Sequence, residues 1–373
     1  METSKTFHTK IAAFIGALLA LGLLGCGGGS STHTTSDLKT DASKTTAAAA
    51  PPGSGSANPG LTAGTGQPDP RPPEKAIRLV FIHHSVGEDW LDDSKGELGA
   101  ELKKNNYFVS DTNYGWGPAD LDTGSENIGD HTDFGHWYNW FAGPNRDTYL
   151  SALYREAGQQ TGSPYARLAA NPDPGGENEV VVIKSCFTNF SALAGNPSDR
   201  PASGSNPLRG QDGSSEYQTV ANIKGIYNDM LGYFASRPDK LFIIVTAPPL
   251  SESETSAAQA ASARALSRWL TEEWLKGYPQ RNVAVFDFYN VLTSNGGGPE
   301  VSDLDMMMSR PGNHHRYWNG SLAYITDKGN NYSAYAVEGD SHPTAAGLQK
   351  ASVEFAGFLN SAYNWWQQTS GQS

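Results

Sequence analysis

The chain has 373 residues, with 39 acidic and 27 basic side chains and a formal net charge of −12. This balance disfavours a nucleic-acid partner, because neutralising phosphates needs a surplus of Lys and Arg, and no long basic run appears. Two cysteines exclude a scaffold built on several disulfides. The single strongly apolar stretch lies within the first 25 residues, so a protein that crosses a membrane many times is excluded.

Residues 1–25 have the pattern of a secretory signal. Lys5 and Lys10 precede an apolar run over 11–24 that is short for a spanning helix. The run ends in Leu23-Leu24-Gly25-Cys26, which resembles the lipobox of bacterial lipoproteins and predicts a lipid on the Cys26 thiol. An ordinary secretory signal with an incidental cysteine is the alternative. We therefore expect a lipid-anchored protein of the cell envelope that faces away from the cytoplasm, on the outer membrane if the host is Gram-negative.

Residues 26–75 are predicted to be a disordered tether. They consist almost entirely of Gly, Ser, Thr, Ala, Pro and a few charged residues, without apolar periodicity. Such a segment cannot bury enough apolar surface to offset the entropy of ordering it. As a flexible coil it reaches on the order of 40 Å, which would hold the following domain clear of the membrane.

Residues 76–373 are predicted to form one α/β domain. Short apolar runs typical of strands buried on both faces occupy 77–82, 180–183, 241–245 and 283–286, with a weaker one at 107–109. Helix patterns cover 220–234, ending before Pro238, and 257–275, with Gly277 as the expected C-cap; a last helix starts near Pro343. This alternation predicts an open parallel sheet with helices on both faces, whose site lies beyond the carboxyl ends of the strands.

The residues that follow these strands suit acyl transfer. Ser85 comes after the first strand, Gly115 after the weaker one and Asn189 after 180–183, while Asp340 and His342 precede the last helix. A hydroxyl can attack a carbonyl when an imidazole accepts its proton and a carboxylate orients the imidazole. Backbone N–H groups and an Asn amide can stabilise the oxyanion. Each residue also has a plainer reading, as a helix N-cap, a turn former or a surface residue.

The segments FIHHSVG, VVVIKSCFTN and DSHPTAAG follow one another in this order along the chain. In their order and their residues they resemble the motifs of the SGNH/GDSL hydrolase superfamily, over roughly 76–362. The resemblance implies a flavodoxin-like sheet and a serine esterase. It implies Ser85 as nucleophile, His342 as base and Asp340 as its acid. The implied oxyanion donors are the Ser85 N–H, Gly115 (with Gly117 as the alternative) and Asn189.

Two positions depart from the family pattern. The residue before the nucleophile is usually Asp, and here it is His84. The acid usually lies three residues before the His, where this chain has Gly339, so Asp340 or Glu338 must take that role. Asp340 is preferred, because two residues apart in an extended segment it projects to the same side as His342.

Aromatic and polar residues are dense over 130–141 and 306–331, and we expect them to shape the substrate site. His84, Trp137 and His315 are the predicted substrate-binding residues, since aromatic faces beside polar groups suit sugar rings. Filling a satellite core is the alternative for these aromatics. No metal or other cofactor is expected, because the His pairs lack a third ligand at suitable spacing. Cys186 is predicted to be a buried small residue rather than a nucleophile.

Together these features predict an extracytoplasmic serine esterase that hydrolyses an acyl ester, with acetyl as the expected group and a carbohydrate as its carrier. A non-catalytic glycan-binding lipoprotein on the same fold is one alternative, kept open by His84. An acyltransferase using the same residues is another. The oligomeric state stays open.

Overall fold

The computed structural model describes residues 69–124, 126–169, 174–191, 193–293 and 340–370. It also describes the backbone of four short strands, β1 (Ser56–Ala57), β7 (His315–Trp318), β8 (Ser321–Tyr324) and β9 (Ala336–Val337). The predicted signal segment and Cys26 lie outside this part of the chain, and so does the predicted tether as far as residue 68, apart from β1, which pairs with β8. Of the helices described, none is long and apolar enough to cross a membrane.

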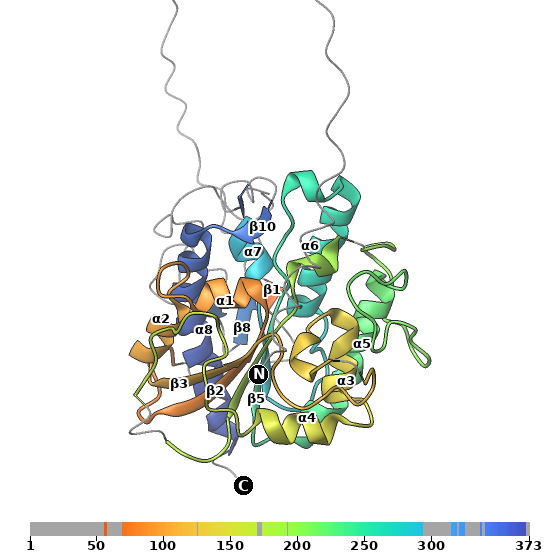
Figure 1. Cartoon of the computed structure of the whole chain (residues 1–373). Helices are drawn as coiled ribbons and strands as arrows, with labels where there is room; N and C mark the ends of the chain where they lie inside the picture. Colours follow the sequence, from red (N-terminus) through yellow and green to blue (C-terminus); the bar gives the residue numbers. More distant parts are fainter. Residues whose placement is uncertain are drawn as a thin grey trace, which may run out of the picture. The chain divides into compact units, whose positions relative to one another are not determined.

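A parallel sheet of five strands forms the centre of the fold, in the order β3-β2-β4-β5-β6 (Figure 1). Its strands are β2 (Ile77–Ile82), β3 (Tyr107–Thr112), β4 (Val180–Lys184), β5 (Leu241–Val245) and β6 (Val283–Phe286). The predicted α/β class with a parallel sheet is confirmed. The weak strand signal at 107–109 underestimates β3, because its second half consists of the buried polar residues Ser110, Asp111 and Thr112.

Side chains that alternate along each strand enter two separate cores. On β2, Leu79 and Phe81 face one core, and Val80 and Ile82 face the other. The first core is closed by α1 (Ser85–Leu91), α2 (Leu98–Lys104), α7 (Phe288–Thr293) and α8 (Ala345–Ser370). The second is closed by α3 (Trp137–Phe141), α4 (Arg146–Leu153), α5 (Val220–Ser236) and α6 (Ala257–Glu272). Helices therefore cover both faces of the sheet (Figure 1).

Local sequence signals explain where the long helices begin and end. The side chain of Thr219 caps α5 by accepting a hydrogen bond from the Asn222 N–H, and the helix ends before Pro238. Ser256 and Gln259 form a capping box at the start of α6. The end predicted for α6 is wrong: the helix stops at Glu272, and Gly277 (φ +81°) lies in the turn beyond it.

The folded part of the chain begins before the predicted boundary at residue 76. The Asn364 side chain on α8 donates to the carbonyl of Asp69, and Asn360 donates to the carbonyl of Pro70. Asn106 donates to the carbonyl of Pro73. Residues 69–75 thus contact the C-terminal helix and the loop before β3, and a domain cut at 76 would lose these bonds.

The segment before α8 is a short strand, β10 (Asp340–Pro343), which pairs with β9 in antiparallel fashion. It carries two of the predicted site residues, Asp340 and His342.

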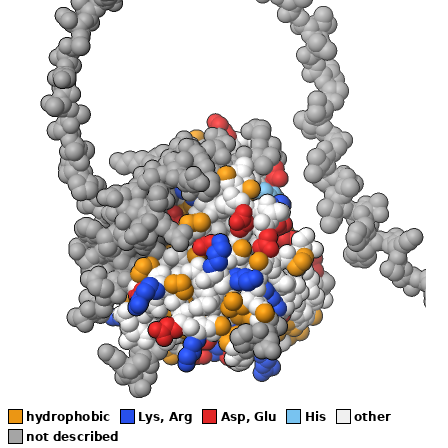
Figure 2. All heavy atoms as spheres, turned by 90° about the vertical axis from the view of Figure 1, so that its left-hand side faces the viewer, with side chains coloured by type: hydrophobic (Ala, Val, Ile, Leu, Met, Phe, Trp, Pro, Cys, Tyr) orange, Lys and Arg blue, Asp and Glu red, His pale blue; other side chains and the backbone are white. Residues whose placement is uncertain are grey.

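On the face of the molecule shown in Figure 2, acidic and basic side chains are interspersed. One ion pair joins Lys95, in the turn between α1 and α2, to Asp89 on α1, and another joins Lys104 to Glu101 within α2.

Candidate active site

The predicted site residues belong to segments that follow the sheet strands or precede the last helix, and two of these segments, the start of α1 and β10, lie at the same edge of the sheet (Figure 1). Ser85 is the first residue of α1, directly after the loop that leaves β2. Gly115 follows β3, and Asn189 lies in the 3-10 helix η4 (Phe187–Phe190) after β4. His342 lies on β10, immediately before α8. Parallel strands end at one edge of a sheet, so segments distant in sequence reach the same place.

Ser85, His342 and Asp340 form one hydrogen-bonded chain. The Ser85 Oγ lies 2.8 Å from His342 Nε2, although the two residues are 257 positions apart. His342 Nδ1 lies 2.5 Å from Asp340 Oδ1, and the backbone N–H of His342 donates to the same oxygen at 3.0 Å.

No family model, curated protein or solved structure matches this chain.

This arrangement sets the proton positions needed for nucleophilic attack. A carboxylate only accepts, so Asp340 fixes a proton on His342 Nδ1, which leaves Nε2 to accept from Ser85. Burial would raise the pKa of Asp340, but the side-chain and backbone hydrogen bonds from His342 bring it below its ordinary value. The carboxyl group is therefore ionised at neutral pH. Glu338, the alternative acid, lies outside the described residues.

The first turn of α1 holds Ser85 against the end of β2. The carbonyl of His84 accepts hydrogen bonds from the N–H groups of Gly87 and Glu88, which starts the helix at Ser85. A Cβ atom at position 87 would lie only 2.3 Å from the Cβ of His83. Only glycine permits this close approach between the helix and the strand end.

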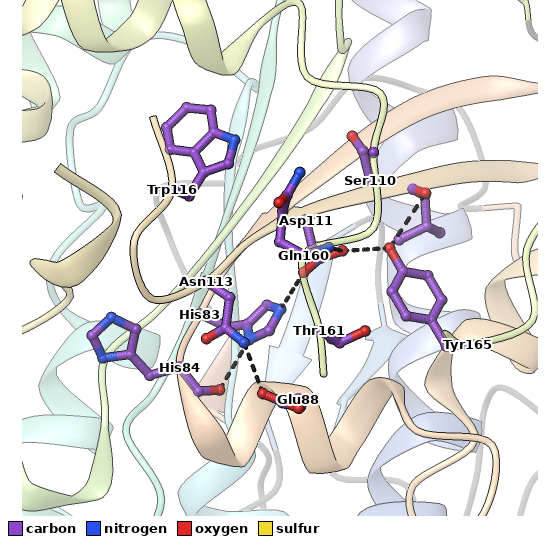
Figure 3. A network of polar contacts seen from close by, with 12 residues as sticks. His83, His84, Glu88, Ser110, Asp111, Asn113, Trp116, Gln160, Thr161 and Tyr165 are labelled. Atoms are coloured by element: carbon purple, nitrogen blue, oxygen red, sulfur yellow. Dashed lines mark hydrogen bonds and ion pairs between the residues drawn. The ribbon is translucent and has the colours of Figure 1, made fainter. Parts of the chain in front are cut away.

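A buried polar network centred on Asp111 lies beside the residues that precede Ser85 (Figure 3). His83 Nε2 lies 3.2 Å from Asp111 Oδ2, and His83 Nδ1 lies 2.9 Å from the carbonyl of His84. The His83 ring is thus held between a carboxylate and a backbone carbonyl. The other oxygen of Asp111 accepts from the Gln160 N–H and the Tyr165 hydroxyl. The network therefore fixes the carbonyl that caps α1.

His84 occupies the position where the family pattern has Asp. Its Nε2 donates to the carbonyl of Gly129 at 2.8 Å, and its ring stacks on Tyr114 with centroids 3.9 Å apart. Burial lowers the pKa of His84 to about 4, and the nearby charges of His83 and Lys184 act in the same direction. The ring is therefore neutral at physiological pH. It is 8% exposed, so a substrate would meet Tyr114 before His84.

Two of the predicted oxyanion donors are bonded to other groups. The Gly115 N–H donates to Asp130 Oδ1 at 2.8 Å. The Asn189 amide donates to Asp133 Oδ1 at 2.6 Å and to the carbonyl of Cys186 at 3.1 Å, which uses both of its hydrogens. Gly117, the alternative glycine, has φ +86°. The structure thus brings Ser85, His342 and Asp340 together but directs Gly115 and Asn189 to nearby carboxylates.

Trp137 is not available to a substrate. It is fully buried, and its indole N–H donates to Ser185 Oγ at 2.7 Å. Trp140 and Phe141 are also fully buried in the second core, so the aromatics of 130–141 fill that core, as the alternative predicted. The side chain of His315 and most of 306–331 lie outside what the structure describes. Cys186 is a buried free thiol.

Sequence reasoning missed two features of this edge. Tyr114 is 57% exposed beside Ser85, and its position directly after a strand was the available signal. A cavity of about 420 Å³ lies between η4, the segment after β5 and α6, lined chiefly by Phe190, Leu250, Tyr289 and small residues of α6. It adjoins β10 through Ser251, whose N–H donates to Ser341 Oγ at 3.0 Å. Among the described residues, no cluster of His, Cys, Asp or Glu could hold a metal ion.

Lys184 ends β4 as a fully buried amine whose Nζ donates to the carbonyl of Ser185. Burial lowers its pKa to about 8, while Cys186 partly opposes this. The unfolded chain therefore binds the proton more tightly, which costs folding stability below pH 8. The cost fades as the pH rises towards the unfolded value.

We expect Lys184→Met to raise the free energy of unfolding at pH 7. A pKa difference of this size corresponds to roughly 3 kcal/mol, and the lost bond to Ser185 offsets about 1 kcal/mol. Chemical denaturation at pH 7 and pH 10 should show a gain that shrinks at the higher pH. Lys276→Met, at an exposed site, is the matched control. A gain that is the same at both pH values would contradict this account.

Proposed function

We propose that the chain is a serine esterase of the SGNH type, acting outside the cytoplasm on an acyl ester carried by a glycan. The observation that carries the proposal is the hydrogen-bonded chain from Ser85 through His342 to Asp340. Helix caps and turns account for serines and histidines one at a time. They do not account for an imidazole held between a hydroxyl and a carboxylate at the edge where α/β folds bind ligands.

The topology of the sheet, and the places that the site residues take in it, also support the SGNH assignment. With the strands numbered along the sheet-forming chain, the order β3-β2-β4-β5-β6 is the doubly wound order 2-1-3-4-5. In this order the nucleophile follows the first strand of the sheet, and the acid and base precede the last helix. Both features agree with the resemblance found in the sequence.

The proposed reaction uses two acyl transfers. Ser85 Oγ attacks the ester carbonyl while His342 Nε2 takes its proton, and the carbonyl π electrons move to the oxygen. The bond to the alcohol then breaks, and His342 returns the proton to that alcohol. Water attacks the acyl-serine in the same way, releasing the acid and regenerating Ser85. Asp340 stabilises the imidazolium that forms in each half.

Acetyl is the proposed acyl group, and the test compares esters of different carriers and lengths. We expect the full chain, purified in detergent, to hydrolyse p-nitrophenyl acetate and to release acetate from an acetylated polysaccharide. Butyrate and octanoate esters report whether the cavity beside β10 accepts longer chains. Binding of the polysaccharide without acetate release would favour a glycan-binding protein. Acetyl transfer to a sugar hydroxyl in preference to water would favour a transferase.

Anchoring through Cys26 is part of the proposal and has its own test. We expect Cys26→Ser to move the protein from the detergent phase to the aqueous phase, because the mutant lacks the thiol that would carry the lipid. Phase partitioning of protein expressed in a bacterial host measures this. Cys186→Ser is the control, since that thiol is buried in the fold. Unchanged partitioning of the Cys26 variant would refute lipidation at this residue.

A further inference from the structure

The oxyanion that the proposed reaction creates needs more than one donor. The Ser85 N–H is one candidate, but Gly115 and Asn189 already donate to Asp130 and Asp133. Catalytic sites for acyl transfer aim more than one preorganised donor at the developing oxyanion. We therefore expect a further donor close to Ser85.

Tyr114 is held over the nucleophile from two sides. Its ring stacks on His84, the residue before Ser85, with an interplanar angle of 24°. The preceding residue, Asn113, donates to Glu88 Oε2 on α1 at 2.7 Å. His84 is itself anchored to the carbonyl of Gly129. The turn after β3 therefore contacts the residue before Ser85, His84, and a residue of α1 after it, Glu88.

The Tyr114 hydroxyl lies close enough to Ser85 for the serine side chain and backbone to influence its pKa. Burial and the neighbouring Cys186 raise the pKa of this phenol, and the two interactions with Ser85 lower it only in part. The hydroxyl therefore keeps its proton at neutral pH. A neutral phenol can donate that proton in a hydrogen bond to an oxygen that becomes negative.

We infer that Tyr114 is a catalytic residue, whose hydroxyl donates a hydrogen bond to the oxyanion formed when Ser85 attacks the ester. The Ser85 N–H is the second donor, and the substrate oxygen enters between the two groups. The inference rests on the proposed function. It also gives His84 a positioning role, because a neutral ring can stack on Tyr114, whereas the Asp of the family pattern offers no ring.

The test is Tyr114→Phe, which keeps the ring and its stacking but removes the donor. We expect kcat for p-nitrophenyl acetate to fall about 10²- to 10³-fold with KM changed little. The affinity for phenylboronic acid, which forms a tetrahedral anion on the nucleophilic serine, should fall with kcat. Tyr217→Phe, at another exposed tyrosine (43%), is the matched control and should behave as wild type.

A double-mutant cycle separates positioning by His84 from a general structural effect. We expect His84→Ala to lower kcat in the wild-type background and to change it little in the Tyr114→Phe background, where no hydroxyl remains to be positioned. Equal effects of His84→Ala in both backgrounds would refute the positioning role.

The possible outcomes separate the oxyanion role of Tyr114 from the proposed esterase activity. Tyr114→Phe with wild-type kcat, in a protein whose Ser85→Ala variant is inactive, would overturn the inference and leave the esterase standing. A raised KM in Tyr114→Ala together with wild-type kinetics in Tyr114→Phe would mean that the ring is a substrate platform, which also overturns it. A wild-type protein that neither hydrolyses esters nor reacts with a fluorophosphonate would refute both.

Discussion

Replacing Ser85 with alanine is expected to lower kcat for ester hydrolysis by about 10⁴-fold or more, because the acyl-enzyme can no longer form. The fold should be unaffected, since the substitution removes the 2.8 Å hydrogen bond with His342 and a further side-chain interaction with Tyr114. A bond of this kind is worth about 1 kcal/mol, which shifts Tm by a few degrees at most.

Two measurements check this result. Initial rates with p-nitrophenyl acetate give kcat, and a fluorophosphonate probe followed by peptide mapping identifies the reactive serine. Ser236→Ala, at an exposed serine of α5, is the control and should keep full activity and labelling. Labelling of a serine other than Ser85, or an active alanine variant, would remove Ser85 from the mechanism.

Asp340→Asn is expected to lower kcat by about 10³- to 10⁴-fold while the fold is retained. An asparagine amide can donate to His342 Nδ1, which would place the imidazole proton on Nε2. That tautomer cannot accept the Ser85 proton. The 2.5 Å contact between Asp340 and Nδ1, together with the 3.0 Å bond from the His342 backbone, makes Asp340 the better candidate than Glu338.

The comparison with Glu338→Gln makes this prediction specific. That variant should lose little activity, and Asp147→Asn, at an exposed position on α4, should lose none. The opposite ranking would transfer the acid role to Glu338. Small effects from both Asp340 and Glu338 would mean that His342 works without a carboxylate partner.

The sheet was largely predictable because strands buried on both faces appear in the sequence as continuous apolar runs. The runs at 77–82, 241–245 and 283–286 are strands with those bounds, since every position except Arg78 carries an apolar side chain for one core or the other. The short helices α1 to α4 left no such trace. They span one or two turns and are stabilised by tertiary contacts rather than by a repeating apolar stripe.

The site was predictable in its position but not in its hydrogen bonds. Placing Ser85 and the Asp340–His342 pair at strand ends followed from topology, because all parallel strands end at one edge. Which donors stay free depends on Asp130 and Asp133, and the polar composition of 130–141 does not say which N–H groups these carboxylates accept from. The burial of Trp137 was equally hidden, since a dense aromatic segment has the same composition in a core as on a surface.

Ser85 and His342 lie 257 positions apart in the sequence, and strands β3, β4, β5 and β6 lie between them. A polypeptide emerges N-terminus first, so Ser85 and all five strands of the sheet are synthesised before the imidazole that accepts the serine proton in the proposed reaction. The base then reaches Ser85 as α8 docks, where Phe355 packs edge-on against Trp90 of α1. A nascent chain, or one shortened before β10, therefore has Ser85 without this proton acceptor. On the proposed mechanism, ester hydrolysis requires synthesis beyond His342 and the packing of β10 and α8 beside α1.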